Sequence, residues 1–96
     1  MLSELPTEVK KLRKEELDRE ILRAGMVAEL DAINLYEQMA AMANSELVRK
    51  LLLDIAREEK THLGEFQALL LEKDREQVGE LEKGKKEVEE LKSSKR

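Results

Sequence analysis

Apolar residues recur every three or four positions along most of this chain, and very little interrupts the pattern. From about residue 8 to residue 42 the only helix-weakening residue is Gly25, and the single proline, Pro6, stands ahead of this stretch. Such sustained periodicity predicts an amphipathic helix roughly 45–50 Å long, at about 1.5 Å per residue. A second stretch, about residues 46–73, follows after a turn at residues 43–45. Because so short a connection makes two helices antiparallel neighbours, the sequence predicts a helical hairpin.

A third, shorter helix is predicted from about residue 75 to residue 91. Asp74 is its expected N-cap, and Gln77 stands three residues on, at the capping-box position. The apolar stripe of this helix is thin and is interrupted by two glycines: Val78, Gly79, Leu81, Gly84, Val88 and Leu91. We expect the helix to be partly ordered and to dock on another surface.

The composition agrees with an all-α fold. The chain has 96 residues, enough for one domain over residues 1–96, and it is 42% charged, 41% hydrophobic and only 2% aromatic. A net charge of −4, with Lys and Arg interspersed among Glu, gives no support for nucleic-acid binding. The chain has no cysteine and therefore no disulfide or thiolate metal site. With no signal peptide and no apolar run long enough to span a membrane, we expect a cytoplasmic protein.

The hairpin should not be stable as a lone unit. Two antiparallel helices share one seam and cannot enclose a core. Both helices carry more apolar residues than one seam can use: Leu17, Ile21, Met26, Leu30, Ile33, Met39, Leu51, Leu53, Ala56, Leu63, Leu70 and Leu71. We therefore expect two chains to associate about a two-fold axis and form a four-helix bundle.

The only histidine lies on an otherwise apolar stripe of the second helix. His62 and Glu59 share this stripe with apolar residues: Val48, Leu52, Ile55, Phe66 and Leu69. Residues three apart on a helix point the same way, and a carboxylate with an imidazole is a competent ligand pair for iron, manganese or zinc. Burying both groups costs several kcal/mol unless a cation or a basic partner compensates.

The first helix has a matching feature. Glu29 is the one acid on a stripe of apolar and small residues: Leu22, Gly25, Ala32, Tyr36 and Ala40. One chain thus offers Glu29, Glu59 and His62 as inward-facing ligands. Two chains would offer four carboxylates and two imidazoles, which is the ligand set of di-iron carboxylate four-helix bundles.

Two other interpretations of these residues are open. His62 could be a buried histidine that is satisfied by a hydrogen bond or by an ion pair across the seam. Glu29 could pair with a basic residue at the edge of the seam, for which the candidates are Arg23, Arg57 and Lys60.

Two segments of the chain resemble the encapsulated ferritins. They are AELDAINLYEQ at residues 28–38 and REEKTH at residues 57–62, and the resemblance covers about residues 15–90. Encapsulated ferritins are half-ferritins of two main helices whose ferroxidase centre forms between subunits inside an encapsulin nanocompartment. The sequence is most similar to the archaeal form, in which this domain is fused to the encapsulin shell protein.

The resemblance implies an activity and a set of ligands. By position, Glu29, Glu59 and His62 match the ferroxidase ligands of the family. The implied reaction is oxidation of Fe(II) to Fe(III) by dioxygen at a di-iron centre shared between two chains. Its product would supply an iron mineral inside the nanocompartment, and the expected assembly is a homodimer or a larger oligomer such as a ring of dimers.

The resemblance also assigns two residues around the centre. Tyr36 matches an aromatic residue beside the metals, although its place on the helix would equally suit a half-buried packing residue. Asp31 matches one member of an acidic metal-entry site, but Ala28 stands where some members have the second acid. The entry site is therefore expected to be incomplete.

Two other functions fit the same residues. One is a different di-metal activity on this scaffold, either peroxide reduction or a reaction like that of manganese catalase. The other is a non-catalytic helical oligomerisation module whose polar seam residues fix the register of the helices.

Overall fold

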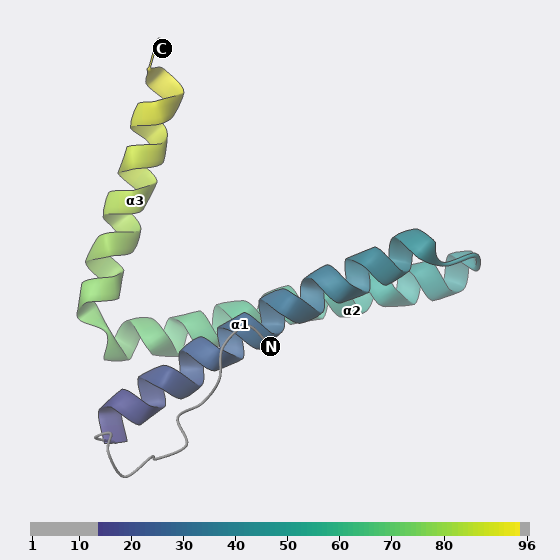
Figure 1. Ribbon diagram of the computed structural model, residues 1–96, viewed down its shortest axis with the longest axis horizontal. Coiled ribbons are helices and arrows are strands. Elements are labelled where there is room, and N and C mark those ends of the chain that lie inside the picture. Colours follow the sequence, from purple (N-terminus) through teal and green to yellow (C-terminus); the bar gives the residue numbers. More distant parts are fainter. Residues whose placement is uncertain (1–13, 95–96) are drawn as a thin grey trace.

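Three α-helices make up the part of the chain that the computed structural model describes, residues 14–94. They are α1 (Lys14–Met42), α2 (Glu46–Lys73) and α3 (Arg75–Ser93), and this part contains no strand. In Figure 1, α1 and α2 lie side by side as a hairpin and α3 projects from the end of α2. The predicted all-α fold is confirmed.

The helix boundaries follow the local sequence. The bounds of α2 are those predicted, and Ser45 caps it by accepting a hydrogen bond from the Val48 backbone N–H at 3.3 Å. Helix α3 begins at the predicted residue and ends two residues later than predicted, at Ser93 rather than residue 91. Residues 8–13, which were predicted to begin the first helix, lie outside the described residues.

The hairpin has a narrow seam. The buried apolar residues are few, and half of them are alanines: Leu22, Ala24, Ile33, Ala40, Ala56 and Leu70. Twelve large apolar side chains are exposed instead: Ile21, Leu30, Leu35, Met42, Leu47, Val48, Leu51, Leu53, Leu69, Leu81, Val88 and Leu91. The described helices therefore leave much of their apolar surface uncovered, as expected for half of a bundle.

One residue shapes the elbow between α2 and α3. Asp74 ends α2 and caps α3, with Oδ1 accepting a hydrogen bond from the Gln77 backbone N–H at 3.0 Å. Its Oδ2 accepts a second hydrogen bond from Arg23 of α1 at 2.7 Å. The Gln77 N–H, and then the guanidinium groups of Arg23 and Arg19, lower the pKa of Asp74 against the opposing effect of burial. The elbow is thus tied to the first half of α1.

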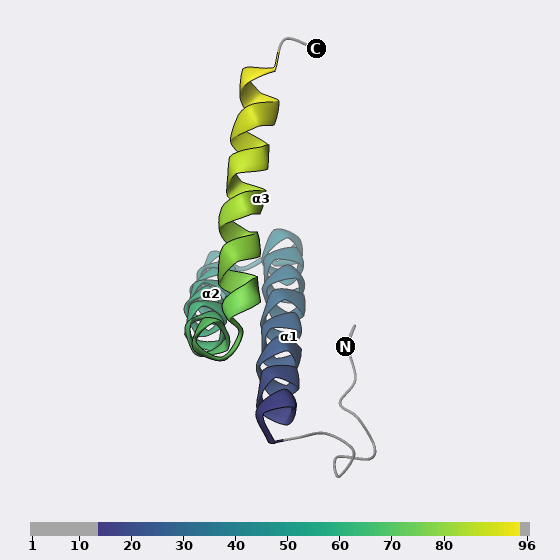
Figure 2. The ribbon, with the colours of Figure 1, turned by 90° about the vertical axis from the view of Figure 1, so that its left-hand side faces the viewer.

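Helix α3 touches the hairpin only near the elbow. Gln77 and Leu81 line a hollow there together with Met26, Leu30 and Leu71 of the hairpin. No residue of α3 is buried, and Figure 2 shows the rest of the helix projecting away from α1 and α2. Within the described residues, no helix is both long and apolar enough to span a bilayer.

Gly25 of α1 lets an aromatic ring pack directly on the helix backbone. A Cβ atom built at this position would lie 2.8 Å from Cε1 of Phe66 on α2. Real Cβ atoms do not approach other atoms so closely, so the ring occupies the space that any larger residue would need. By contrast, a Cβ atom built at Gly64 of α2 would meet nothing within 4 Å.

We expect Gly25→Ala to destabilise the protein, although alanine is the better helix former by about 1 kcal/mol. Overpacking against Phe66 should cost about 1–3 kcal/mol. Gly64→Ala is the matched control and should be neutral or stabilising. Denaturant unfolding at one fixed protein concentration measures both changes. Equal stabilisation by the two substitutions would show that Phe66 moves aside without cost.

Candidate metal centre

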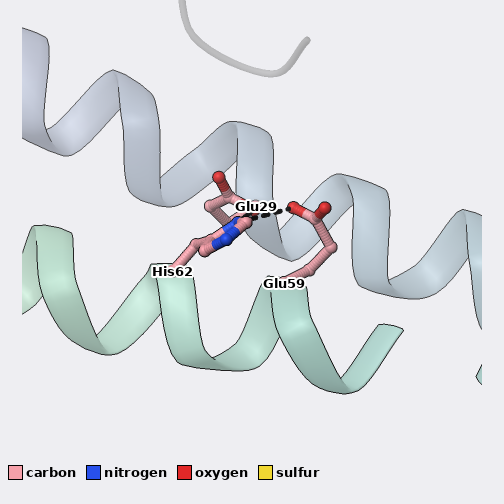
Figure 3. A group of neighbouring side chains, drawn as sticks. All are labelled: Glu29, Glu59 and His62. Carbon is pink, nitrogen blue, oxygen red and sulfur yellow. Dashed lines mark ion pairs between the residues drawn. The ribbon is translucent and has the colours of Figure 1, made fainter. Parts of the chain in front are cut away.

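The three predicted ligands come together across the hairpin seam. Glu29 projects from α1, and Glu59 and His62 project from successive turns of α2 (Figure 3). One ligand atom from each side chain lies within 4.8 Å of the other two. Among the described residues this is the one cluster of three or more histidine and acidic side chains with metal-ligand spacing.

The distances within this triad are too long for direct hydrogen bonds. Nδ1 of His62 lies 3.7 Å from Oε2 of Glu29 and 3.6 Å from Oε2 of Glu59. A hydrogen bond between nitrogen and oxygen is typically 2.7–3.2 Å long. Oε2 of Glu29 is also buried without any hydrogen-bond partner among the described residues. The triad therefore contains an acceptor that receives no hydrogen bond from the described residues.

The two carboxylate side chains are largely shielded from solvent. The side chains of Glu29 and Glu59 are only 16% and 20% exposed, whereas His62 is 47% exposed. Two carboxylates held so near one another repel each other, and burial strengthens this repulsion. The imidazole offsets it only when it is protonated.

Among the described residues, none of the arginine and lysine candidates at the seam pairs with Glu29; its one ion-pair contact is with His62, and only if the imidazole is protonated. The three candidates form ion pairs with other acids: Arg23 with Asp74 at 2.7 Å, Arg57 with Asp54 at 2.9 Å, and Lys60 with Glu37 at 3.3 Å. The interpretation of Glu29 as a structural ion-pair partner of one of these bases is therefore wrong.

The geometry fits a bound cation instead. Ligand bonds to such an ion are about 2.0–2.2 Å long, so a single ion can touch two atoms that lie roughly 3–4 Å apart. The spacings between Nδ1 of His62 and the two carboxylates fall in this range. A set of two oxygens and one imidazole nitrogen suits iron, manganese or zinc. A cation would also provide Oε2 of Glu29 with the partner that it lacks.

An apolar hollow of about 370 Å³ opens beside the triad. It is lined by Leu22, Glu29, His62, Glu65, Phe66 and Leu69. The sequence alone did not indicate that Glu65, whose side chain is exposed, lines this hollow, or that Phe66 contacts Gly25. The spacing of three residues from His62 to Glu65 was the available signal that Glu65 lies beside the triad. The small residue at position 25 was the available signal for the close packing of Phe66.

Two other predicted site residues lie outside the cluster. Tyr36 is half-buried on α1, and Asp31 is exposed on the same helix. The structure brings neither of them into the metal-ligand group. Their roles beside the centre and on the entry route stay predictions.

Comparison with known proteins places this chain in a family. The family model described as Rubrerythrin matches residues 20–95, so the chain belongs to the rubrerythrin family. Its fold also matches the crystal structure of the encapsulated ferritin domain from Pyrococcus furiosus. The TM-score is 0.83, with 55% identity over 100% of both chains. The predicted resemblance to encapsulated ferritins is confirmed.

The chain also matches part of a relative that is longer than the chain itself. The chain is 62% identical over 94 residues to the ferritin-like–encapsulin shell fusion protein of Pyrococcus furiosus. The match covers 95% of this chain but 27% of the relative, so the chain spans about a quarter of that protein's length.

We expect Glu29→Gln to stabilise the metal-free protein while removing its response to metal. An amide relieves the repulsion with Glu59 and supplies a donor, which should raise the free energy of unfolding by about 1 kcal/mol. At pH 8, thermal unfolding in chelator and in excess Mn²⁺ would measure both effects. Wild type should gain roughly 2.7 kcal/mol at a metal concentration of 100 times Kd, and the variant much less.

The control for this experiment is Glu58→Gln, on the exposed face of α2. It should change neither the metal-free stability nor the response to Mn²⁺. A Glu29→Gln protein that is less stable than wild type in chelator would show that the carboxylate is satisfied without a metal.

Proposed function

We propose that two copies of this chain form a di-iron centre between them and oxidise Fe(II) to Fe(III) with dioxygen. The observation that carries this proposal is the triad of Glu29, Glu59 and His62 around a buried, unpartnered carboxylate oxygen. Membership of the rubrerythrin family and the likeness to an encapsulated ferritin domain support it.

The number of ligands argues for a second chain. Three protein ligands can hold one ion, whereas di-iron carboxylate bundles use four glutamates and two histidines for a pair. Two triads related by a two-fold axis supply that set. The apolar residues beside the triad on α2 support this pairing, because Val48, Leu51 and Leu69 are 48%, 58% and 51% exposed and would be covered by the second hairpin.

Each ligand has a distinct part in the proposed reaction. The carboxylates of Glu29 and Glu59 bind the Fe(II) substrate and, as hard oxygen donors, favour the Fe(III) product. Their negative charge offsets the additional positive charge that each iron acquires when dioxygen takes its electron. His62 binds through Nδ1, the ring nitrogen that faces both carboxylates, which requires this nitrogen to be unprotonated.

Two further residues have proposed roles around the centre. Tyr36 would stand beside the metals as a hydrogen-bonding aromatic residue. Asp31, exposed on α1, would attract incoming Fe(II), without the second acid that some encapsulated ferritins have at the position of Ala28.

The relative with a shell domain suggests where the product goes. Its printed name joins a ferritin-like part to an encapsulin shell. We therefore infer that this chain acts inside an encapsulin nanocompartment in the cytoplasm, as a dimer or a ring of dimers. Because a half-ferritin bundle encloses no storage cavity, the Fe(III) product would mineralise within the surrounding shell.

We expect Glu29→Ala, Glu59→Ala and His62→Ala each to reduce the rate of iron oxidation by roughly 100-fold or more. Loss of residues outside the ligand set of a metal site already costs about 10–100-fold in typical cases. The measurement is anaerobic loading with Fe(II) followed by exposure to air, with the Fe(III) absorbance recorded over time. Glu58→Ala is the control, because Glu58 lies on the same helix but on an exposed face.

Three kinds of result would contradict the proposal. Equal loss of activity in Glu58→Ala and Glu59→Ala would place the reaction elsewhere. Oxidation of Fe(II) by peroxide but not by dioxygen, or disproportionation of peroxide by the manganese-loaded protein, would favour another di-metal activity. Absence of bound metal and of any oxidation would favour a helical oligomerisation module.

A shared centre also predicts the stoichiometry of binding. Two irons per pair of chains amount to one tightly held iron per chain, and anaerobic titration should show this as the first phase. A mixed dimer of wild type with a Glu59→Ala, His62→Ala chain should have no intact centre, because the centre draws on both partners. Two tight irons per chain, or half of the wild-type activity in mixed dimers, would show that each chain builds its own centre.

A further inference from the structure

Helix α3 has almost no partner among the residues that the structure describes. It runs for 19 residues, contains two glycines and buries none of its side chains. An isolated helix of this length is only marginally stable in water, and each interior glycine weakens it further. A helix that projects from the hairpin in this way therefore needs a contact that residues 14–94 of its own chain do not supply (Figure 2).

The apolar residues of α3 follow the spacing of a coiled-coil seam. Leu81, Gly84, Val88 and Leu91 are separated by three, four and three residues, which are the intervals between a and d positions of a heptad. The three larger side chains are 44%, 50% and 68% exposed. At Gly84, an added Cβ atom would meet nothing within 4 Å, so the seam is open at this position as well.

The charges beside this seam select one kind of partner. With Leu81 and Val88 at a positions, the g positions are Glu80 and Glu87 and the e positions are Lys85 and Lys92. In a parallel pair of identical helices, each g residue faces the e residue five positions later on the partner. Glu80 then faces Lys85, and Glu87 faces Lys92, on both sides of the seam. An antiparallel pair would instead bring glutamate to glutamate and lysine to lysine.

We propose that α3 pairs in parallel and in register with α3 of a second copy of this chain. Leu81, Gly84, Val88 and Leu91 form the seam of this pair. The contact is independent of the iron centre and does not rest on the proposed ferroxidase activity. It competes with one ion pair within the chain, Lys92 with Glu89 at 3.4 Å, whose side chains are 67% and 61% exposed. A pair so exposed to solvent contributes little and gives way readily.

The surface at the elbow extends this contact. Leu81 also lines the hollow formed with Met26, Leu30 and Leu71, so the apolar stripe of α3 continues onto the hairpin. This hollow is separate from the one beside Glu29 and His62. A chain with two different self-complementary contacts builds assemblies larger than a dimer, because each contact adds another copy.

Cysteine cross-linking tests the pairing directly, because the natural chain contains no cysteine. Val88→Cys and Leu91→Cys should each form disulfide-linked dimers in a glutathione redox buffer at least ten times faster than Glu82→Cys and Lys86→Cys, which lie outside the seam. In-register parallel helices align both seam positions with themselves, whereas an antiparallel pair can align only one. The same cross-linking in a Glu59→Ala, His62→Ala background would show that α3 pairs without the metal site.

Charge exchange provides a second arm of the test. Glu87→Lys should slow cross-linking through Leu91→Cys at least fivefold, and adding Lys92→Glu to that protein should restore it. Gly84→Leu should speed cross-linking, whereas Gly79→Leu should not, since it gives a similar gain in helix propensity outside the seam. Cross-linking at only one seam position, equal rates at the control positions, or failure of Lys92→Glu to rescue Glu87→Lys would overturn the proposal.

Discussion

The narrow seam between α1 and α2 is the constraint on which the rest of the structure depends. Small residues at this seam are almost fully buried, with Ala40 and Ala56 each 2% exposed. Phe66 packs directly on the backbone of Gly25. Close helices leave little space for large side chains between them. Many leucines of the hairpin therefore lie on its outer faces and remain exposed, although Leu22 and Leu70 are buried in the seam. The same close approach brings Glu29 of α1 within reach of Glu59 and His62 of α2.

The triad lowers the stability of the hairpin at the site that we propose binds metal. Two partly buried carboxylates face one another, and one of their oxygens is buried without a partner. A hydrophobic residue at position 29 would remove the unsatisfied oxygen and continue the apolar stripe. Departures from local packing rules of this kind are typical of functional sites, where the missing interaction is supplied by a ligand. The nearby arginines and lysine could have neutralised Glu29, but each is paired with another acid.

The sequence predicted the helices well because their signals are local. Helix periodicity and caps such as Ser45 and Asp74 depend only on neighbouring residues, and both caps are seen in the structure. The grouping of Glu29 with Glu59 and His62 was also predictable, since each interrupts an apolar stripe that must face the seam. The ring of Phe66 over Gly25, and the place of Glu65 beside the triad, were not. They depend on the exact axial offset of the two helices, which a stripe does not specify.

The direction of α3 also could not be predicted from local sequence, because it depends on one residue that joins three elements. Asp74 ends α2, caps α3 and accepts the Arg23 side chain of α1, so the elbow cannot open without breaking a contact to the first helix. A free linker would let α3 fold back and cover the hairpin with its own apolar stripe. The elbow prevents this, so the apolar faces of both the hairpin and α3 stay available. Contact with other copies of the chain, as we propose, would remove these uncovered faces from water and compensate for the thin core.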